Sequence, residues 1–92
     1  MARPVQVRPN LGRDGWPTLP MTDHPHEAAR RFVLNLREAM GEASVRSTAI
    51  GAEVDRNSLR MVLDGETWPD AKLVAKLELH FKRTLWPGYF EE

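Results

Sequence analysis

The fold is decided by residues 49–65, which read AIGAEVDRNSLRMVLDG. Asp55 predicts a helix that begins at Arg56, because its carboxylate can accept a backbone N–H two or three residues further along. Gly65 can adopt the left-handed conformation that ends a helix. The apolar positions between them have helical spacing and predict a buried stripe: Leu59, Val62 and Leu63. The stretch therefore reads as the end of one short helix, a tight turn and a second short helix.

The opposite face of the second helix carries the strongest functional signal in the chain. It presents side chains that can contact nucleobases and that have little structural reason to be there: Arg56, Asn57, Arg60 and Met61. Taken alone, such a face is more often merely solvated than functional. Asp55 at its start is more easily explained as a helix cap than as a binding residue.

Working outward, the chain divides into an arm, a helical domain and a short tail. Residues 1–22 contain four prolines and predict an extended arm with polyproline II character. Residues 23–88 predict the folded domain, and residues 89–92 an acidic and aromatic tail. Caps and apolar spacing predict the following helices: 23–40 after Thr22 or Asp23, 45–52 after Ser44, 56–64, 70–82, and a last short turn after Thr84 that carries Leu85 and Trp86. The result is a compact all-α bundle of four to five helices.

Composition restricts the classes of function. Ninety-two residues make one domain with a single core, and the chain has no cysteine for a disulfide or a thiolate metal site. No signal peptide or membrane span is evident, so we expect a cytoplasmic protein without membrane association. Lys and Arg together balance Asp and Glu at 13 each. This balance argues against indiscriminate nucleic-acid binding, but basic residues are in excess in residues 1–22 and 44–63, which permits one basic face.

Catalytic and metal-binding functions find little support. No nucleophile with a base and no glycine-rich phosphate loop is present. His24 and His26 flank Pro25, but a third ligand is not evident, so we expect neither a metal site nor a cofactor. We therefore do not expect an enzyme.

The segment from about residue 29 to residue 86 resembles the phage-repressor-like (Xre/Cro-type, lambda-repressor-like) helix-turn-helix family of DNA-binding proteins. The resemblance is carried by small, apolar and capping residues at the family's spacing: Thr48, Ala49, Ala52, Val54, Asp55, Leu59, Val62 and Gly65. The segments WPD, KLVAKLELHF and LWP are similar to the version common in actinobacterial proteins. Glu53 departs from the family pattern, because the family often has glycine there, so either the geometry of the turn differs or Glu53 adopts a strained φ.

This resemblance implies a sequence-specific regulator of transcription, for example a small repressor, that reads double-stranded DNA. The third helix of the family lies in the major groove, which makes the exposed set of Arg56, Asn57, Arg60 and Met61 the expected base readers. The expected phosphate contacts are Ser44, Val45, Arg46, Ser47 and Ser58, the first of these at the positive end of a helix. Arginines of the arm can add salt-sensitive attraction.

Two further expectations concern partners. One such module is too small for high affinity, so we expect a homodimer, with Leu85, Trp86, Tyr89 and Phe90 as the candidate interface. The alternative is that Leu85 and Trp86 close the core. A competing hypothesis for the whole chain is a protein-interaction module on the same fold, such as an antitoxin-like or phage-encoded modulator, because the chain has zero net charge and the acidic residues Glu53 and Asp55.

Overall fold

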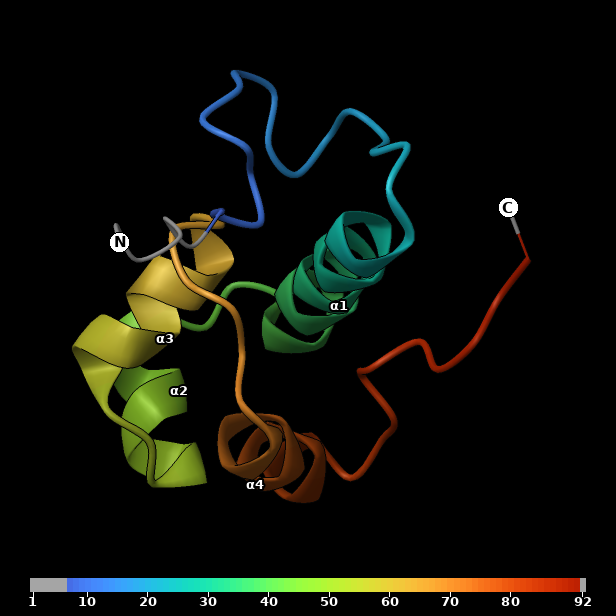
Figure 1. Ribbon diagram of the computed structural model, residues 1–92. Helices are drawn as coiled ribbons and strands as arrows, with labels where there is room; N and C mark the ends of the chain where they lie inside the picture. The colour runs from blue at the N-terminus through green and yellow to red at the C-terminus, as the bar shows by residue number, and fades with distance from the viewer. Residues whose placement is uncertain (1–6, 92) are drawn as a thin grey trace, which may run out of the picture.

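Four helices make up the regular structure of residues 7–91, the part of the chain that this computed structural model describes (Figure 1). They are α1 (His24–Met40), α2 (Val45–Ala52), α3 (Arg56–Leu63) and α4 (Ala71–Phe81). No strand is present in this part. The predicted all-α fold is therefore confirmed for these residues, while residues 1–6 of the predicted arm and Glu92 of the tail lie outside them.

Capping side chains set the starts of three helices. Ser44 Oγ accepts the backbone N–H of Ser47 at 3.0 Å, which fixes the start of α2. Asp70 Oδ1 accepts the backbone N–H of Leu73 at 2.7 Å, which fixes the start of α4. Asp55 does the same for α3, whereas Asp23 occupies the cap position of α1 without a capping hydrogen bond from its side chain, and Pro25 lies in the first turn of that helix. Local sequence chemistry thus determines these boundaries.

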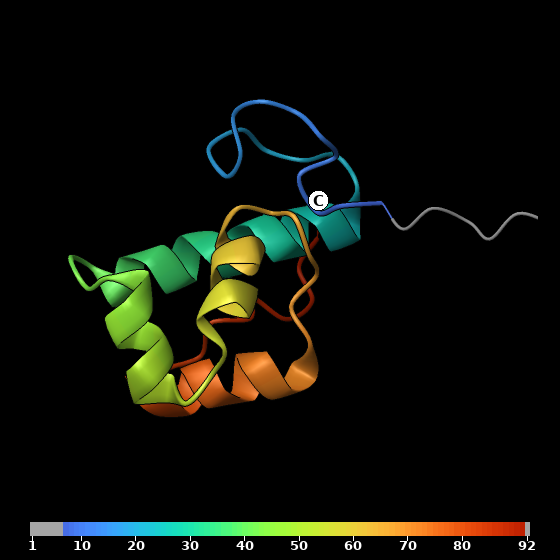
Figure 2. The ribbon, with the colours of Figure 1, turned by 90° about the vertical axis from the view of Figure 1, so that its left-hand side faces the viewer.

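The core lies between α1 and α4, with α2 and α3 closing one side (Figure 2). It consists of side chains from all four helices and from the segment after α4, the largest of them fully buried: Phe32, Leu36, Leu59, Leu77 and Leu85. α2 packs against both α3 and α4. This packing leaves the opposite face of α3 at the surface.

The predicted fifth helical turn after Thr84 is wrong, because this segment has no helix. Instead, the Glu78 carboxylate on α4 accepts the backbone N–H groups of Leu85, at 2.7 Å, and Trp86, at 3.0 Å. These bonds hold the segment in a non-helical path that inserts Leu85 into the core. Residues 7–91 therefore contain four helices.

The N-terminal segment, residues 7–22, forms a series of turns and not an extended arm (Figure 2). Asn10 explains part of this path, because its Oδ1 accepts the N–H of Gly12 and its backbone N–H bonds to Gly65 O at 3.0 Å. Trp16 Nε1 donates to Leu63 O at 3.0 Å, and Trp68 Nε1 donates to Val7 O at 2.7 Å. The segment is thereby fastened to the connection between α3 and α4.

A second group of contacts fastens the N-terminal segment to α1. The Glu27 carboxylate, nearly buried, accepts hydrogen bonds from the Arg30 and Arg31 guanidinium groups and from the Met21 backbone N–H. Arg30 also donates to Pro17 O at 3.1 Å. The hydrogen bond from Arg30 is the main reason that the pKa of Glu27 falls from 4.5 to about 2.

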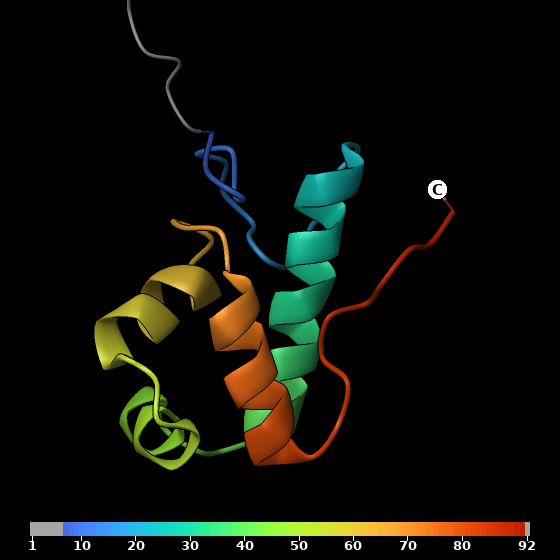
Figure 3. The same cartoon turned by 60° about the horizontal axis from the view of Figure 1, so that its bottom comes forward.

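The C-terminal segment returns along α1 (Figure 3). The Phe90 ring lies 3.8 Å from the guanidinium carbon of Arg31, a cation–π contact, and 4.4 Å from the His24 ring. Tyr89 stays 82% exposed.

Candidate functional site

The turn between α2 and α3 consists of residues 53–55 and depends on a left-handed residue. Glu53 has φ 59° and ψ 45°, so the structure has the second of the two alternatives for this position, the strained φ. Lys76 on α4 donates from Nζ to Glu53 O at 2.8 Å, and Val54 N donates to Ala49 O at 3.0 Å. These bonds hold the turn even though a non-glycine residue is strained in this conformation.

Asp55 acts as the cap of α3. Its Oδ2 accepts the backbone N–H of Ser58 at 2.8 Å and the Ser58 hydroxyl at 3.1 Å. The backbone bond from Ser58 is the main cause that lowers the pKa of the Asp55 carboxyl. Asp55 therefore carries a negative charge at neutral pH, and Ser58, a predicted phosphate contact, already donates its hydroxyl to this carboxylate.

The outer face of α3 is open to solvent. Arg56, Asn57 and Arg60 are exposed, and Met61 is 37% exposed. The hydrogen bonds that residues 7–22 make beyond the segment go to α1 and to residues 63–68, at the end of α3 and beyond, and not to this face. Asn57 Nδ2 lies 3.7 Å from Met61 Sδ, so the structure brings these two predicted base readers together.

The other two predicted base readers occupy different positions around the helix. Arg56 is the first residue of α3 and stands beside the turn. Arg60 faces a pocket that lies toward α1 and the start of α2, whereas Met61 faces a groove toward α4. The four side chains thus form a row across α3 and not a single cluster.

Most of the predicted phosphate contacts lie at the start of α2. Ser44, Arg46 and Ser47 are exposed and Val45 is half-buried. The two serine hydroxyls bond to each other at 3.1 Å, and the Ser47 hydroxyl also donates to Ser44 O. This first turn presents the positive end of a helix to solvent, which is the arrangement that favours an anion.

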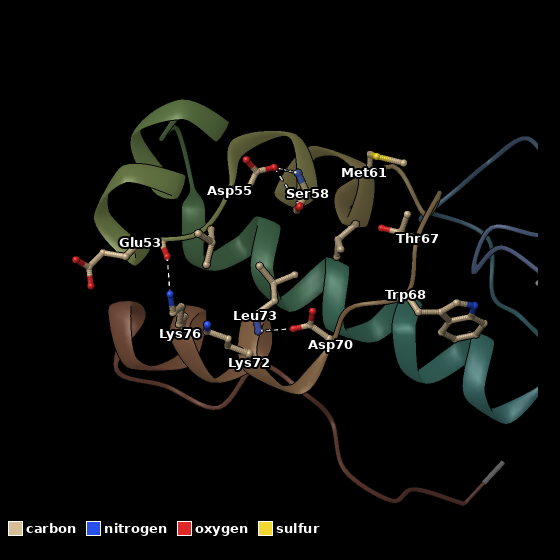
Figure 4. Close-up of a pocket in the computed structure, with 12 residues that line it drawn as sticks. Glu53, Asp55, Ser58, Met61, Thr67, Trp68, Asp70, Lys72, Leu73 and Lys76 are labelled. Atoms are coloured by element: carbon tan, nitrogen blue, oxygen red, sulfur yellow. Dashed lines mark hydrogen bonds between the residues drawn. The ribbon is translucent and has the colours of Figure 1, made fainter.

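A groove of about 420 Å³ separates α3 from α4 (Figure 4). Its rim carries three carboxylates and two lysines: Glu53, Asp55, Asp70, Lys72 and Lys76. Asp55 and Asp70 are engaged as helix caps, and Lys76 bonds to Glu53 O. Acidic groups therefore prevail on this side of α3.

A smaller pocket, of about 350 Å³, lies on the other side of α3. It is lined by residues from α1, α2 and α3 and by the turn after α1: Arg37, Met40, Gly41, Val45, Arg60, Leu63 and Asp64. Arg37 was not among the predicted site residues. Its signal in the sequence is weak, because it is only its place one turn before the end of α1 that brings it near the start of α2.

The predicted dimer residues have four different surroundings. Leu85 is fully buried in the core, so its assignment to a dimer surface is wrong, and the core alternative holds for it. Trp86 is partly buried, with its ring 5.8 Å from that of Phe32. Phe90 is partly buried on Arg31, and only Tyr89 is largely exposed.

Comparison of the chain with protein-family models, with characterised proteins and with solved structures gives no match. Within residues 7–91, none of the helices has the length and apolar character needed to cross a membrane.

Proposed function

We propose that this protein is a sequence-specific double-stranded DNA-binding regulator of transcription. In this proposal α2, the turn at residues 53–55 and α3 act as a helix-turn-helix, with α3 in the major groove. The observation that carries the proposal is the solvent-exposed row on α3, where two arginines and an asparagine stand uncovered. Guanidinium and carboxamide groups are the donors that best match guanine and adenine edges in that groove.

Arg56 and Asn57 are the proposed principal base readers. Both lie in the first turn of α3, the end that meets base edges in this docking mode, and both are exposed. Met61 lies beside Asn57, where its apolar side chain can contact a thymine methyl group. The start of α2, with Ser44, Arg46 and Ser47, supplies phosphate contacts.

We also propose that the functional unit is a homodimer on two half-sites, since a single module buries too little surface for high affinity. Tyr89 is the member of the predicted interface that stays largely exposed. Sedimentation of the free protein and of its complex with DNA tests this: we expect two chains per bound duplex. One chain per duplex would contradict it.

The test of DNA recognition is selection of preferred sequences from a random duplex pool, followed by gel-shift titration of wild type and variants. We expect Arg56→Ala and Asn57→Ala to remain folded and to lose about 1–3 kcal/mol of discrimination each, at the base pair that each side chain contacts. Arg83→Ala is the matched control, because Arg83 is an exposed arginine beyond α4. Equal binding of selected and random duplex by the wild type at low salt would contradict the proposal.

A protein-interaction module is the second candidate, and one observation favours it. Three carboxylates, Glu53, Asp55 and Asp70, stand on the rim of the groove beside α3, where they repel DNA phosphate. Affinity purification from the native cell, with identification of bound proteins by mass spectrometry, separates the two functions. A stoichiometric protein partner whose binding is abolished by Asp70→Asn but not by Arg56→Ala would support this candidate, and recovery of the protein alone would count against it.

A further inference from the structure

We propose that Arg37 and Arg60 form a clamp for one backbone phosphate of the bound DNA, in the pocket between α1, α2 and α3. This inference rests on the proposed function and refines it, because it assigns Arg60 to the phosphate backbone and adds Arg37, from α1, to the binding surface. The observation that carries the inference is that two arginines from separate helices line one open pocket of about 350 Å³.

Arg37 is held in place by the end of α3. Its Nη2 lies 3.4 Å from Leu63 O, the carbonyl that also accepts the Trp16 Nε1 hydrogen at 3.0 Å. A guanidinium has five N–H donors, and this is the hydrogen bond that Arg37 makes within residues 7–91. The remaining donors are therefore available to a ligand, and their direction is already restricted by the backbone contact.

Arg60 lines the same pocket from α3. It lies on α3 one turn before Asp64, and it is exposed. Asp64 is the acidic residue that lines the pocket, so two positive groups face one negative group. The net positive charge of these three groups favours an anion. Phosphate suits arginine in particular, because a guanidinium binds two phosphate oxygens through two parallel N–H groups.

The surroundings favour a phosphate that belongs to a nucleic acid. Val45, the first residue of α2, lines the same pocket, so the positive end of that helix adjoins the two arginines. Met40 and Leu63 supply apolar walls, against which a deoxyribose can pack. With α3 in the major groove, a strand on this side meets positive groups, whereas a strand on the α4 side meets the carboxylates of the groove in Figure 4.

The experiment measures the salt dependence of DNA binding for Arg37→Gln and Arg60→Gln, with Arg83→Gln as the control. Glutamine removes the charge but keeps a polar side chain that suits a helix, and thermal melting verifies folding. We expect each pocket variant to lower the slope of log K against log salt by about one, with the ratio of preferred to random duplex unchanged. Arg37→Lys, which retains the charge, should retain the slope. An unchanged slope would overturn the clamp, as would an Arg60→Gln effect confined to one base pair.

A second measurement separates failure of the clamp from failure of the proposed function. Inorganic phosphate is titrated into the full chain at low salt, and the arginine Nε–Hε resonances are followed by NMR. We expect saturable shifts at Arg37 and Arg60, loss of the Arg60 shift in Arg37→Gln, and no shift at Arg83. Absence of saturable shifts would overturn the pocket even if DNA binds. If phosphate shifts the two arginine resonances but the protein binds no DNA, the anion pocket stands and the proposed regulatory function is contradicted.

Discussion

Thr48 carries a buried hydroxyl group on α2 that has no hydrogen-bond partner within residues 7–91. A buried polar group without a partner costs about 1–3 kcal/mol, because it has lost its bonds to water. We expect Thr48→Val to raise the free energy of unfolding by about 1 kcal/mol in urea denaturation. Thr48→Ser, which keeps the hydroxyl and removes the methyl group, should lower it by a similar amount. Stabilisation by serine would show that volume, and not the hydroxyl, limits this site.

Glu53 is the second residue at which the chain carries a local cost. A left-handed residue with a Cβ atom costs about 1–2 kcal/mol. Glycine avoids this strain, but it also loses more conformational entropy on folding, so only part of the cost is removed. We therefore expect Glu53→Gly to stabilise the protein by about 0.5–1 kcal/mol, measured by thermal melting. Glu53→Ala is the control, since it removes the carboxylate but keeps the Cβ atom. Equal gains from both variants would assign the effect to charge.

At the scale of elements, the first turn of α1 depends on the ionised carboxylate of Glu27. Its pKa is about 2 in the folded protein, against the ordinary value of 4.5. A lowered folded-state pKa contributes stability above pH 5, and this contribution disappears as the pH falls toward 2. The shift corresponds to about 3 kcal/mol. We expect Glu27→Gln to be destabilised by up to that amount at pH 7. The difference from wild type should vanish near pH 2, and a difference that does not depend on pH would contradict this origin.

The positions of the elements could be predicted largely from the sequence, since the signals are local. Ser44, Asp55 and Asp70 cap helices within three residues, so the predicted starts of α2 and α3 agree with the structure, and that of α4 agrees within one residue. The segment after α4 could not be predicted, because its path depends on Glu78, which lies seven residues earlier and accepts two of its N–H groups. Thr84 alone is equally compatible with a helix start.

In the candidate site, too, the features set by local sequence could be predicted and those set by tertiary packing could not. The exposed row on α3 could be predicted from helical spacing, because opposite faces of one helix follow from one pattern. Arg37 and Arg60 are 23 positions apart in the sequence, and only the packing of α1 against the other helices brings both to one pocket. The sequence leaves Leu85 open between a dimer surface and the core, because its burial depends on a chain path that no local pattern encodes.

At the scale of the whole molecule, Gly65 is the point at which the N-terminal segment and the end of α3 meet. A Cβ atom there would lie 2.7 Å from the Trp16 ring and 2.8 Å from Asn10 Cβ, and φ is +71°. Gly88 has a similar φ, +73°, with open space around it. We expect Gly88→Ala to cost about 1–2 kcal/mol and Gly65→Ala at least 1 kcal/mol more, measured by denaturation. Equal losses of stability in the two variants would show that Trp16 and Asn10 move away from the added Cβ atom at no cost in free energy.

The indole of Trp16 is also an intrinsic fluorescent probe of the end of α3. Its Nε1 bonds to the last residue of α3, and the same carbonyl receives Arg37. Indole emission shifts in wavelength when such a bond stretches or when water reaches the ring. With Trp68 and Trp86 replaced by phenylalanine, fluorescence would follow, without any added dye, each event that tilts α3 or draws Arg37 toward an anion.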